Sequence, residues 1–258
     1  AQAAPFTWSV GGQLGWGRAG ALRFHISRNF NLPTFNDRFW LEYGKPNLRP
    51  EKGYSSDVGW VFQKQRFSAE ITAFQLLLDD WILWLPGTDG IFRPDNLRKV
   101  WSRGLETSAS LEFGVWSLKC RISGRYQFLK ATNVAVYGGS ESVLNKQLPY
   151  TPNHSAGAVL KIEKDWFSMA YLHQWAGQRF TTSDNLEQLR GFTTGSLLGQ
   201  VFFKTGKWKS DSALADKQQS FKVGLDFHLQ NIWNTPYQII AYRPMPGRSF
   251  RIGIMIRW

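Results

Sequence analysis

The sequence lacks several features on which other classes of protein depend. Its one cysteine, Cys120, excludes an internal disulfide and a multi-cysteine metal site. Its four histidines lie on separate segments, and no hydrolase triad is evident. No run reaches the roughly 18 apolar residues that a transmembrane helix needs, and sustained helical periodicity is missing. We therefore expect no catalytic residue, no metal site and no cofactor.

Alternation of apolar and polar residues recurs instead from one end of the chain to the other. In residues 220–231, Val223 and Leu225 fall on one parity, and Asp226 and His228 on the other. Aromatic residues make up 16% of the chain, yet the mean hydropathy is only −0.33, because polar residues are interleaved with them. Such alternation fits a soluble sandwich, whose apolar face is the core. It fits equally a membrane barrel, whose apolar face meets lipid.

The lengths of the connections separate these two folds. The predicted strands number eleven and lie near residues 6–16, 20–30, 54–63, 66–80, 98–114, 116–132, 153–163, 166–178, 193–205, 219–230 and 248–258. The connections alternate between tight turns, at 17–20, 63–65, 114–116 and 164–166, and longer loops, at 31–53, 81–97, 133–152, 179–192 and 231–247. The link at 206–218 fits the short set poorly. Short turns at one end and long loops at the other predict an all-β, antiparallel transmembrane β-barrel.

Four segments resemble motifs of the TonB-dependent outer-membrane receptors. They are PTFNDRFW with GKPNLRPEKG (33–53), VWSRGLE (100–106), LPYTPNH (148–154) and the last 28 residues, from NIWNTPY at 231–237 to the final strand. They follow the family's order, although Lys45 stands where Asn is commoner and Trp233 where Phe is. The segments at 44–53 and 231–258 look most like cobalamin receptors.

The resemblance implies a 22-stranded barrel plugged by a separate N-terminal domain. Residues 1–258 would then form a single partial-barrel domain, the last eleven strands, without the plug. An odd number of strands would place Ala1 in an extracellular loop and Trp258 at the periplasmic side. An open sheet in lipid leaves two unpaired edges. We therefore expect a second polypeptide, the N-terminal half of the same receptor, to supply the other strands, the plug and the contact with TonB.

Function follows from the same resemblance. It implies energised uptake of a scarce nutrient across the bacterial outer membrane, with cobalamin or another corrinoid first and a ferric siderophore or haem next. Aromatic side chains on long loops suit a large, flat ligand, and the expected ligand-binding residues are Trp40, Tyr43, Trp84, Phe92, Tyr137 and Tyr242. The polar residues expected to face the lumen are Arg121, Arg125, Asp226 and His228. The loop carboxylates Asp79, Asp80, Asp89 and Asp95 lack the spacing of a calcium cage.

A net charge of +12 indicates anionic partners. The basic residues are spread along the chain, so no nucleic-acid partner is expected. Six arginines near the expected mouth suit either an anionic siderophore or the phosphates of lipopolysaccharide in the outer-membrane lipid: Arg38, Arg49, Arg93, Arg98, Arg190 and Arg243. Two other functions stay open, namely a small closed-barrel outer-membrane enzyme and a structural subunit of an outer-membrane complex.

Overall fold

The computed structural model describes residues 5–86, 91–135, 143–208 and 219–257. These residues are nearly all β-structure, with one short α-helix and one 3-10 turn. In chain order the elements are β1 (Trp8–Gly15), η1 (Gly17–Ala19), β2 (Ala21–Asn31), α1 (Phe35–Phe39), β3 (Glu51–Lys64), β4 (Phe67–Pro86), β5 (Phe92–Val115), β6 (Leu118–Asn133), β7 (His154–Lys164), β8 (Phe167–Ala176), β9 (Arg179–Phe180), β10 (Gln188–Leu189), β11 (Phe192–Trp208), β12 (Gln219–Gln230), β13 (Gln238–Ile240), β14 (Arg243–Pro244) and β15 (Ser249–Arg257).

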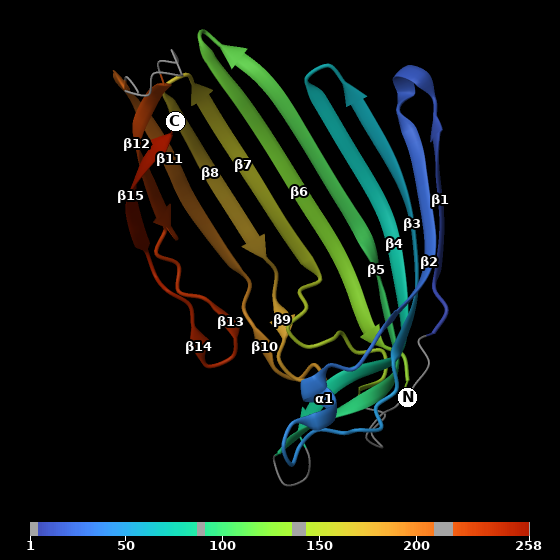
Figure 1. Ribbon diagram of the computed structural model, residues 1–258. Coiled ribbons are helices and arrows are strands. Elements are labelled where there is room, and N and C mark those ends of the chain that lie inside the picture. The colour runs from blue at the N-terminus through green and yellow to red at the C-terminus, as the bar shows by residue number, and fades with distance from the viewer. Residues whose placement is uncertain (1–4, 87–90, 136–142, 209–218, 258) are drawn as a thin grey trace, which may run out of the picture.

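Eleven of these strands form one antiparallel sheet, in the order β1-β2-β3-β4-β5-β6-β7-β8-β11-β12-β15. Each strand pairs with the strand next to it along the chain, which is the up-and-down order of a barrel wall. The sheet curves strongly, but β1 and β15 lie at its two edges, and the described strands do not close (Figure 1). The predicted all-β fold and its eleven antiparallel strands are confirmed.

The two ends of the sheet differ, as the connection lengths predicted. The hairpin turns β1–β2, β3–β4 and β5–β6 lie together at the top of Figure 1. Helix α1 and the small hairpins β9–β10 and β13–β14 lie at the opposite end. We call these the short-turn end and the long-loop end.

One predicted loop is wrong. Residues 81–97 are largely strand, because β4 continues to Pro86 and β5 begins at Phe92. Their pairing runs from Trp81 opposite Leu97 to Pro86 opposite Phe92. The hairpin therefore projects beyond its neighbours, and its backbone groups bond to each other instead of to a loop. Three other predicted loops contain short elements, namely α1, β9–β10 and β13–β14.

The molecule has almost no apolar core of its own. Among the described residues, the buried apolar side chains are Leu48, Pro50, Pro94, Val100, Cys120, Ala131 and Val143. One face of the sheet instead exposes large apolar side chains on every strand. On β15, Phe250, Ile252, Ile254 and Ile256 are 59% to 78% exposed. A contiguous exposed apolar surface of this extent indicates that another apolar phase or partner covers it.

The opposite face of the sheet is polar. Arg23 of β2 pairs with Glu70 of β4 across the intervening strand β3, and Arg121 of β6 pairs with Glu112 of the neighbouring strand β5. Ser68 bonds to Ser110 at 2.8 Å, and Gln127 donates to Glu106 at 2.7 Å. None of the helices in the described ranges is long and apolar enough to span a bilayer.

Candidate functional site

The site begins at the projecting β4–β5 hairpin of the long-loop end. We call residues 79–86 and 92–99 the outer hairpin, and residues 32–50, between β2 and β3, the docked segment. Leu48 is 1% exposed, which shows how closely the docked segment packs on its surroundings.

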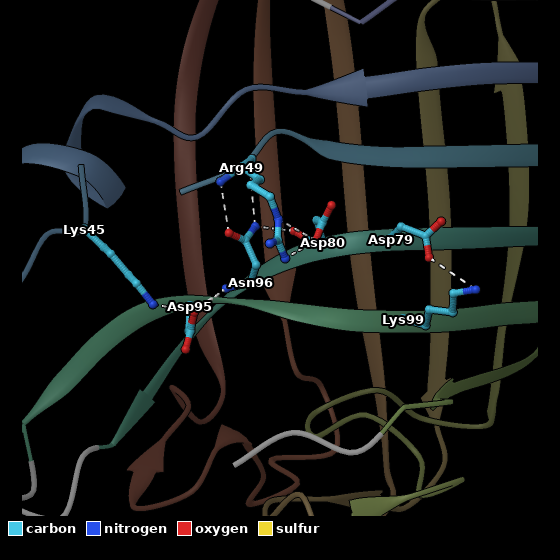
Figure 2. Close-up of polar contacts among 7 residues, drawn as sticks. All are labelled: Lys45, Arg49, Asp79, Asp80, Asp95, Asn96 and Lys99. Carbon is cyan, nitrogen blue, oxygen red and sulfur yellow. Dashed lines mark hydrogen bonds and ion pairs between the residues drawn. The ribbon is translucent and has the colours of Figure 1, made fainter. Parts of the chain in front are cut away.

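A polar cluster fastens the docked segment to the outer hairpin (Figure 2). The Arg49 Nε donates to Asp80 Oδ1 at 2.9 Å. The Asn96 side chain accepts from Arg49 N at 3.0 Å, and its Nδ2 donates to Arg49 O at 3.1 Å and to Asp80 O at 2.6 Å. Asn96 thus satisfies backbone groups of both partners where the strand ladder cannot reach them.

Two ion pairs flank this cluster. Lys45 Nζ lies 2.7 Å from Asp95 Oδ1, and Lys99 Nζ lies 3.8 Å from Asp79 Oδ1. Each carboxylate drawn in Figure 2 therefore faces a cation of the chain itself. In the described ranges, no three His, Cys, Asp or Glu residues group as metal ligands would, and Asp89 lies outside those ranges.

Helix α1 is held at its N-terminus by a capping box. Thr34 Oγ1 accepts from Asp37 N, and the Asp37 carboxylate accepts from Thr34 N at 2.8 Å. The second Asp37 oxygen accepts from Trp84 Nε1 of the outer hairpin at 2.9 Å. Partial burial raises the pKa of the Asp37 carboxyl, but the hydrogen bonds from Thr34 and Trp84 outweigh it and hold that pKa below its ordinary value of 3.8.

Four of the six predicted ligand-binding aromatics lie in this region. Trp40 and Tyr43 are in the docked segment, and Trp84 and Phe92 are in the outer hairpin. Trp40 and Phe92 are more than half exposed, whereas Trp84 is half-buried and its indole N–H is engaged by Asp37. Tyr137 lies outside the described residues. The structure brings these four aromatics to one region, and their contact with a ligand stays a prediction. Sequence reasoning missed that Trp84 holds the docked segment in place.

Tyr242 lies in a second part of the long-loop end, at the β13–β14 turn, and is 91% exposed. Its hairpin is tied to the neighbouring loop through Arg179, which is 4% exposed and donates to Gln238 O. Burial lowers the pKa of the Arg179 guanidinium below its ordinary range. Phe192 stacks on Tyr237 at 4.5 Å in the same place.

A third loop joins this group through a pair of amides. Gln147 N donates to Asn185 Oδ1 at 2.9 Å, and Asn185 Nδ2 donates back to Gln147 O at 2.8 Å. The loops at 143–153, 177–191 and 231–248 are therefore linked in series around the long-loop end. Sequence reasoning missed these links, because their partners are about 40 to 60 residues apart and short-range patterns carry no sign of them.

The four polar residues predicted for the lumen all lie on the polar face, in two pairs. Arg121 and Arg125 belong to β6, and Asp226 and His228 belong to β12, with three strands between them. Arg121 is paired with Glu112. Arg125 lines two hollows, of about 610 and 490 Å³. His228 and Arg251 line a hollow of about 110 Å³.

Three of the four histidines have local partners, and the four form no shared constellation. His25 Nδ1 is 3.4 Å from Asp57, His154 Nδ1 is 2.7 Å from the Tyr126 hydroxyl, and His173 Nδ1 is 2.8 Å from the Tyr171 hydroxyl. The predicted mouth arginines are partly engaged as well, since Arg38 donates to Pro46 O and Arg49 donates to Asp80. The side chain of Arg98 lies outside the described parts of the chain.

Comparison with known proteins agrees with this geometry. Residues 3–223 match the family model described as TonB dependent receptor-like, beta-barrel. A vitamin B12 transporter, BtuB, of Vibrio vulnificus is 34% identical over 124 residues, 47% of this chain and 20% of the transporter. BtuB of Photobacterium profundum is 31% identical over 177 residues, 67% of this chain and 27% of the transporter. The chain thus spans about a quarter of these relatives or less.

Solved structures share the fold at lower identity. The copper transporter OprC superposes with a TM-score of 0.69 at 16% identity, over 95% of this chain and 39% of OprC. The ferric citrate transporter FecA gives a TM-score of 0.69 at 14% identity, over 97% of this chain and 38% of FecA. The family consists of receptors and transporters of the bacterial outer membrane and not of enzymes. This chain, with its open wall of eleven antiparallel strands, belongs to the TonB-dependent receptor β-barrel family.

Proposed function

We propose that the chain is part of a TonB-dependent transporter that takes up cobalamin or another corrinoid across the outer membrane. The observation that carries this proposal is the identity of 34% and 31% to two vitamin B12 transporters. Ferric siderophores and haem are the next candidates, since fold neighbours named as iron transporters have the same wall. Their identities of 16% and 14% support the fold alone.

The exposed apolar face supports a place in lipid. Large apolar side chains on every strand need an apolar phase, and a bilayer supplies it. The long-loop end then faces the outside of the cell, and the short-turn end faces the periplasm. Residues 1–258 act in this proposal as one partial-barrel domain.

Ligand binding is assigned to the long-loop end. Trp40, Tyr43 and Phe92 present rings beside the outer hairpin, and Tyr242 presents another on the β13–β14 turn. Rigid aromatic rings suit the broad apolar edge of a corrin. Trp84 acts by holding the docked segment through Asp37.

The polar face lines the lumen in this proposal, through Arg121, Arg125, Asp226 and His228. An open sheet in lipid leaves the backbone groups of two edges unpaired, at several kcal/mol for each group. We assign the closing strands and the plug to the N-terminal half of the receptor, and contact with TonB to that half. No observation favours an enzyme or a purely structural subunit.

Competition binding tests the ligand. Labelled cyanocobalamin is bound to cells that express the full-length receptor, and unlabelled cobalamin, a ferric siderophore or haem is added. We expect that only cobalamin displaces the label. We also expect Trp40→Ala to weaken cobalamin binding about tenfold, because the Trp40 ring would lose an aromatic contact that the bound ligand covers. Trp116→Ala, at an exposed turn of the short-turn end, is the matched control. Failure of cobalamin to compete would end the corrinoid assignment.

A further inference from the structure

A groove on the apolar face of β2–β6 has a cationic end. Its volume is about 690 Å³. Phe24, Val58, Leu105 and Phe128 belong to its apolar lining, and Arg103 and Lys130 to its polar end. This groove lies on the face opposite the predicted lumen residues, so the proposed uptake of a ligand makes no use of it.

The register explains why the groove has two ends. Val58, Ala73, Leu105 and Phe128 are direct neighbours in one row across four strands. The small side chain of Ala73 leaves that row hollow between larger ones. The next row toward the long-loop end is polar and consists of Ser56, Gln75, Arg103 and Lys130.

Arg103 is held in place on this face. Its guanidinium lies 3.7 Å from the centre of the Trp101 ring, and its NH1 donates to Thr132 Oγ1 at 3.3 Å. The Arg103 guanidinium is therefore a fixed, charged donor at the polar end of the groove. Lys130, next to Arg103 on β6, is exposed.

The surroundings of the polar end are cationic. Arg28, Lys52 and Lys99 lie on the same parity, in the two rows beyond it toward the long-loop end. Among the described residues, those two rows contain one carboxylate, that of Asp79. Its Oδ1 lies 3.8 Å from Lys99 Nζ. Asp57, at the edge of the groove, pairs with His25 on the polar face. An anion is thus favoured at this end of the groove.

The depth of this row matches a lipid headgroup. Arg103 is twelve residues from Val115, the last residue of β5 at the short-turn end. At about 3.3 Å per residue and a tilt of about 40°, Arg103 lies roughly 30 Å above that turn. The apolar band of an outer-membrane barrel is about 25 Å tall. With the orientation proposed above, Arg103 and Lys130 reach the headgroups of the outer leaflet.

We propose that this groove binds one phosphorylated, multiply acylated glycolipid of the outer leaflet, with acyl chains along Phe24, Leu105 and Phe128 and a phosphate on Arg103 and Lys130. Guanidinium and ammonium groups are the usual partners of phosphate. Arg103 and Lys130 thus take the role of phosphate partner that the sequence suggested for Arg38 and Arg49. The side chains of Arg38 and Arg49 are engaged within the chain. This assignment rests on the proposed membrane orientation but not on the identity of the transported ligand.

Native mass spectrometry of the intact, delipidated receptor tests the assignment. The probes are bisphosphorylated lipid A, the same lipid without phosphates, and phosphatidylglycerol. We expect lipid A to bind, and the double variant Arg103→Gln/Lys130→Gln to lower its apparent affinity at least tenfold. Lys64→Gln/Arg66→Gln removes two cations from the short-turn end and is expected to change nothing.

Equal binding of lipid A and its dephosphorylated form, or full binding by the double variant, would overturn the proposal. Equal binding of phosphatidylglycerol would also overturn it, since a general anionic-lipid site needs no glycolipid. Lys130→Gln alone, at an exposed position, is expected to lower the apparent affinity for lipid A about threefold. It replaces the double variant in the test if the double variant folds poorly. Cobalamin binding measured on the same samples separates failure here from failure of the proposed transport.

Discussion

At the scale of single residues, Asp37 holds the proposed ligand-binding region together. Its carboxylate caps α1 through Thr34 and also receives the indole N–H of Trp84 from the outer hairpin. One side chain therefore joins the element that carries Trp40 to the element that carries Phe92. The aromatic pattern of the sequence indicated both elements, but not this join, because Asp37 and Trp84 are 47 residues apart.

Replacement of Asp37 should loosen the docked segment. Asp37→Ala removes the cap and the bond to Trp84, which together contribute about 1–2 kcal/mol of local stability. We expect amide hydrogen exchange in residues 32–50 to become about five- to thirtyfold faster, while exchange in β6–β8 stays unchanged. Asn36→Ala, an exposed position of the same helix, is the control. Unchanged exchange in Asp37→Ala would contradict the role given to this carboxylate.

The same carboxylate gives the docked segment a dependence on pH. The pKa of Asp37 is lower in the folded protein than its ordinary value of 3.8. Such a group contributes its full stabilisation above pH 3.8 and loses it as the pH falls through the folded value. Exchange in residues 32–50, corrected for intrinsic rates, should therefore rise below pH 3.8 in the wild type. In Asp37→Ala that rise should be smaller.

At the scale of elements, the motifs of the family resemblance have structural explanations. In the 44–53 motif, Leu48 is buried and Glu51 Oε1 accepts from Ile82 N at 2.8 Å. In the 231–237 motif, Asn231 is buried, and its side chain accepts from Thr235 N and donates to Thr235 O, both at 2.9 Å. These motifs anchor loops to the wall. They identify the family well and say little about the ligand.

Asn96 offers a direct test of this anchoring. Asn96→Ala leaves Arg49 N, Arg49 O and Asp80 O without their partner on the outer hairpin. Two of these hydrogen bonds are exposed and one is half-buried, and bonds of this kind contribute about 0.5–1.5 kcal/mol each. We expect protease cleavage within 32–50 in the folded receptor, together with weaker ligand binding. Asn36→Ala again serves as the control, and resistance to cleavage in Asn96→Ala would count against the anchor.

The wall itself is closely fitted at Gly104, in the 100–106 motif. A Cβ there would lie 2.0 Å from Phe128 O of the neighbouring strand. Gly104→Ala should therefore force the β5–β6 pair apart and destabilise the barrel by about 1–3 kcal/mol. Gly124→Ala is the matched control, because its Cβ would come no closer than 3.9 Å to Gly157 O. Urea unfolding in detergent measures both, and equal midpoints would contradict the close fit.

Alternation predicted the strands well where lipid and lumen impose it. It failed in the outer hairpin, where "WILWLP" at 81–86 lacks alternation and falls in the predicted loop 81–97. Beyond the bilayer neither face of a strand needs to be apolar, so the period that marks membrane strands disappears. Pro94 lies within β5, although proline normally argues against a strand. The links through Arg179, Asn185 and Gln147 depend on tertiary contacts that no local pattern contains.

At the scale of the whole molecule, an exposed apolar face, sorted connections and an open sheet belong to one explanation. The apolar face needs an apolar phase, the polar face needs water, and in the proposed barrel both edges pair with further strands. The sequence alone predicted this architecture, because period-2 alternation and connection length report directly on membrane and water. The ligand is not encoded so directly, since exposed loop residues differ most among relatives.

Energised uptake is the central claim, and one measurement tests it most directly. Cells without another cobalamin receptor express the full-length receptor, with or without TonB, and accumulation of labelled cyanocobalamin is followed. We predict surface binding in both strains and accumulation, at least tenfold above background, only where TonB is present. Accumulation that is equal in the two strains, or absent from both, would contradict the account.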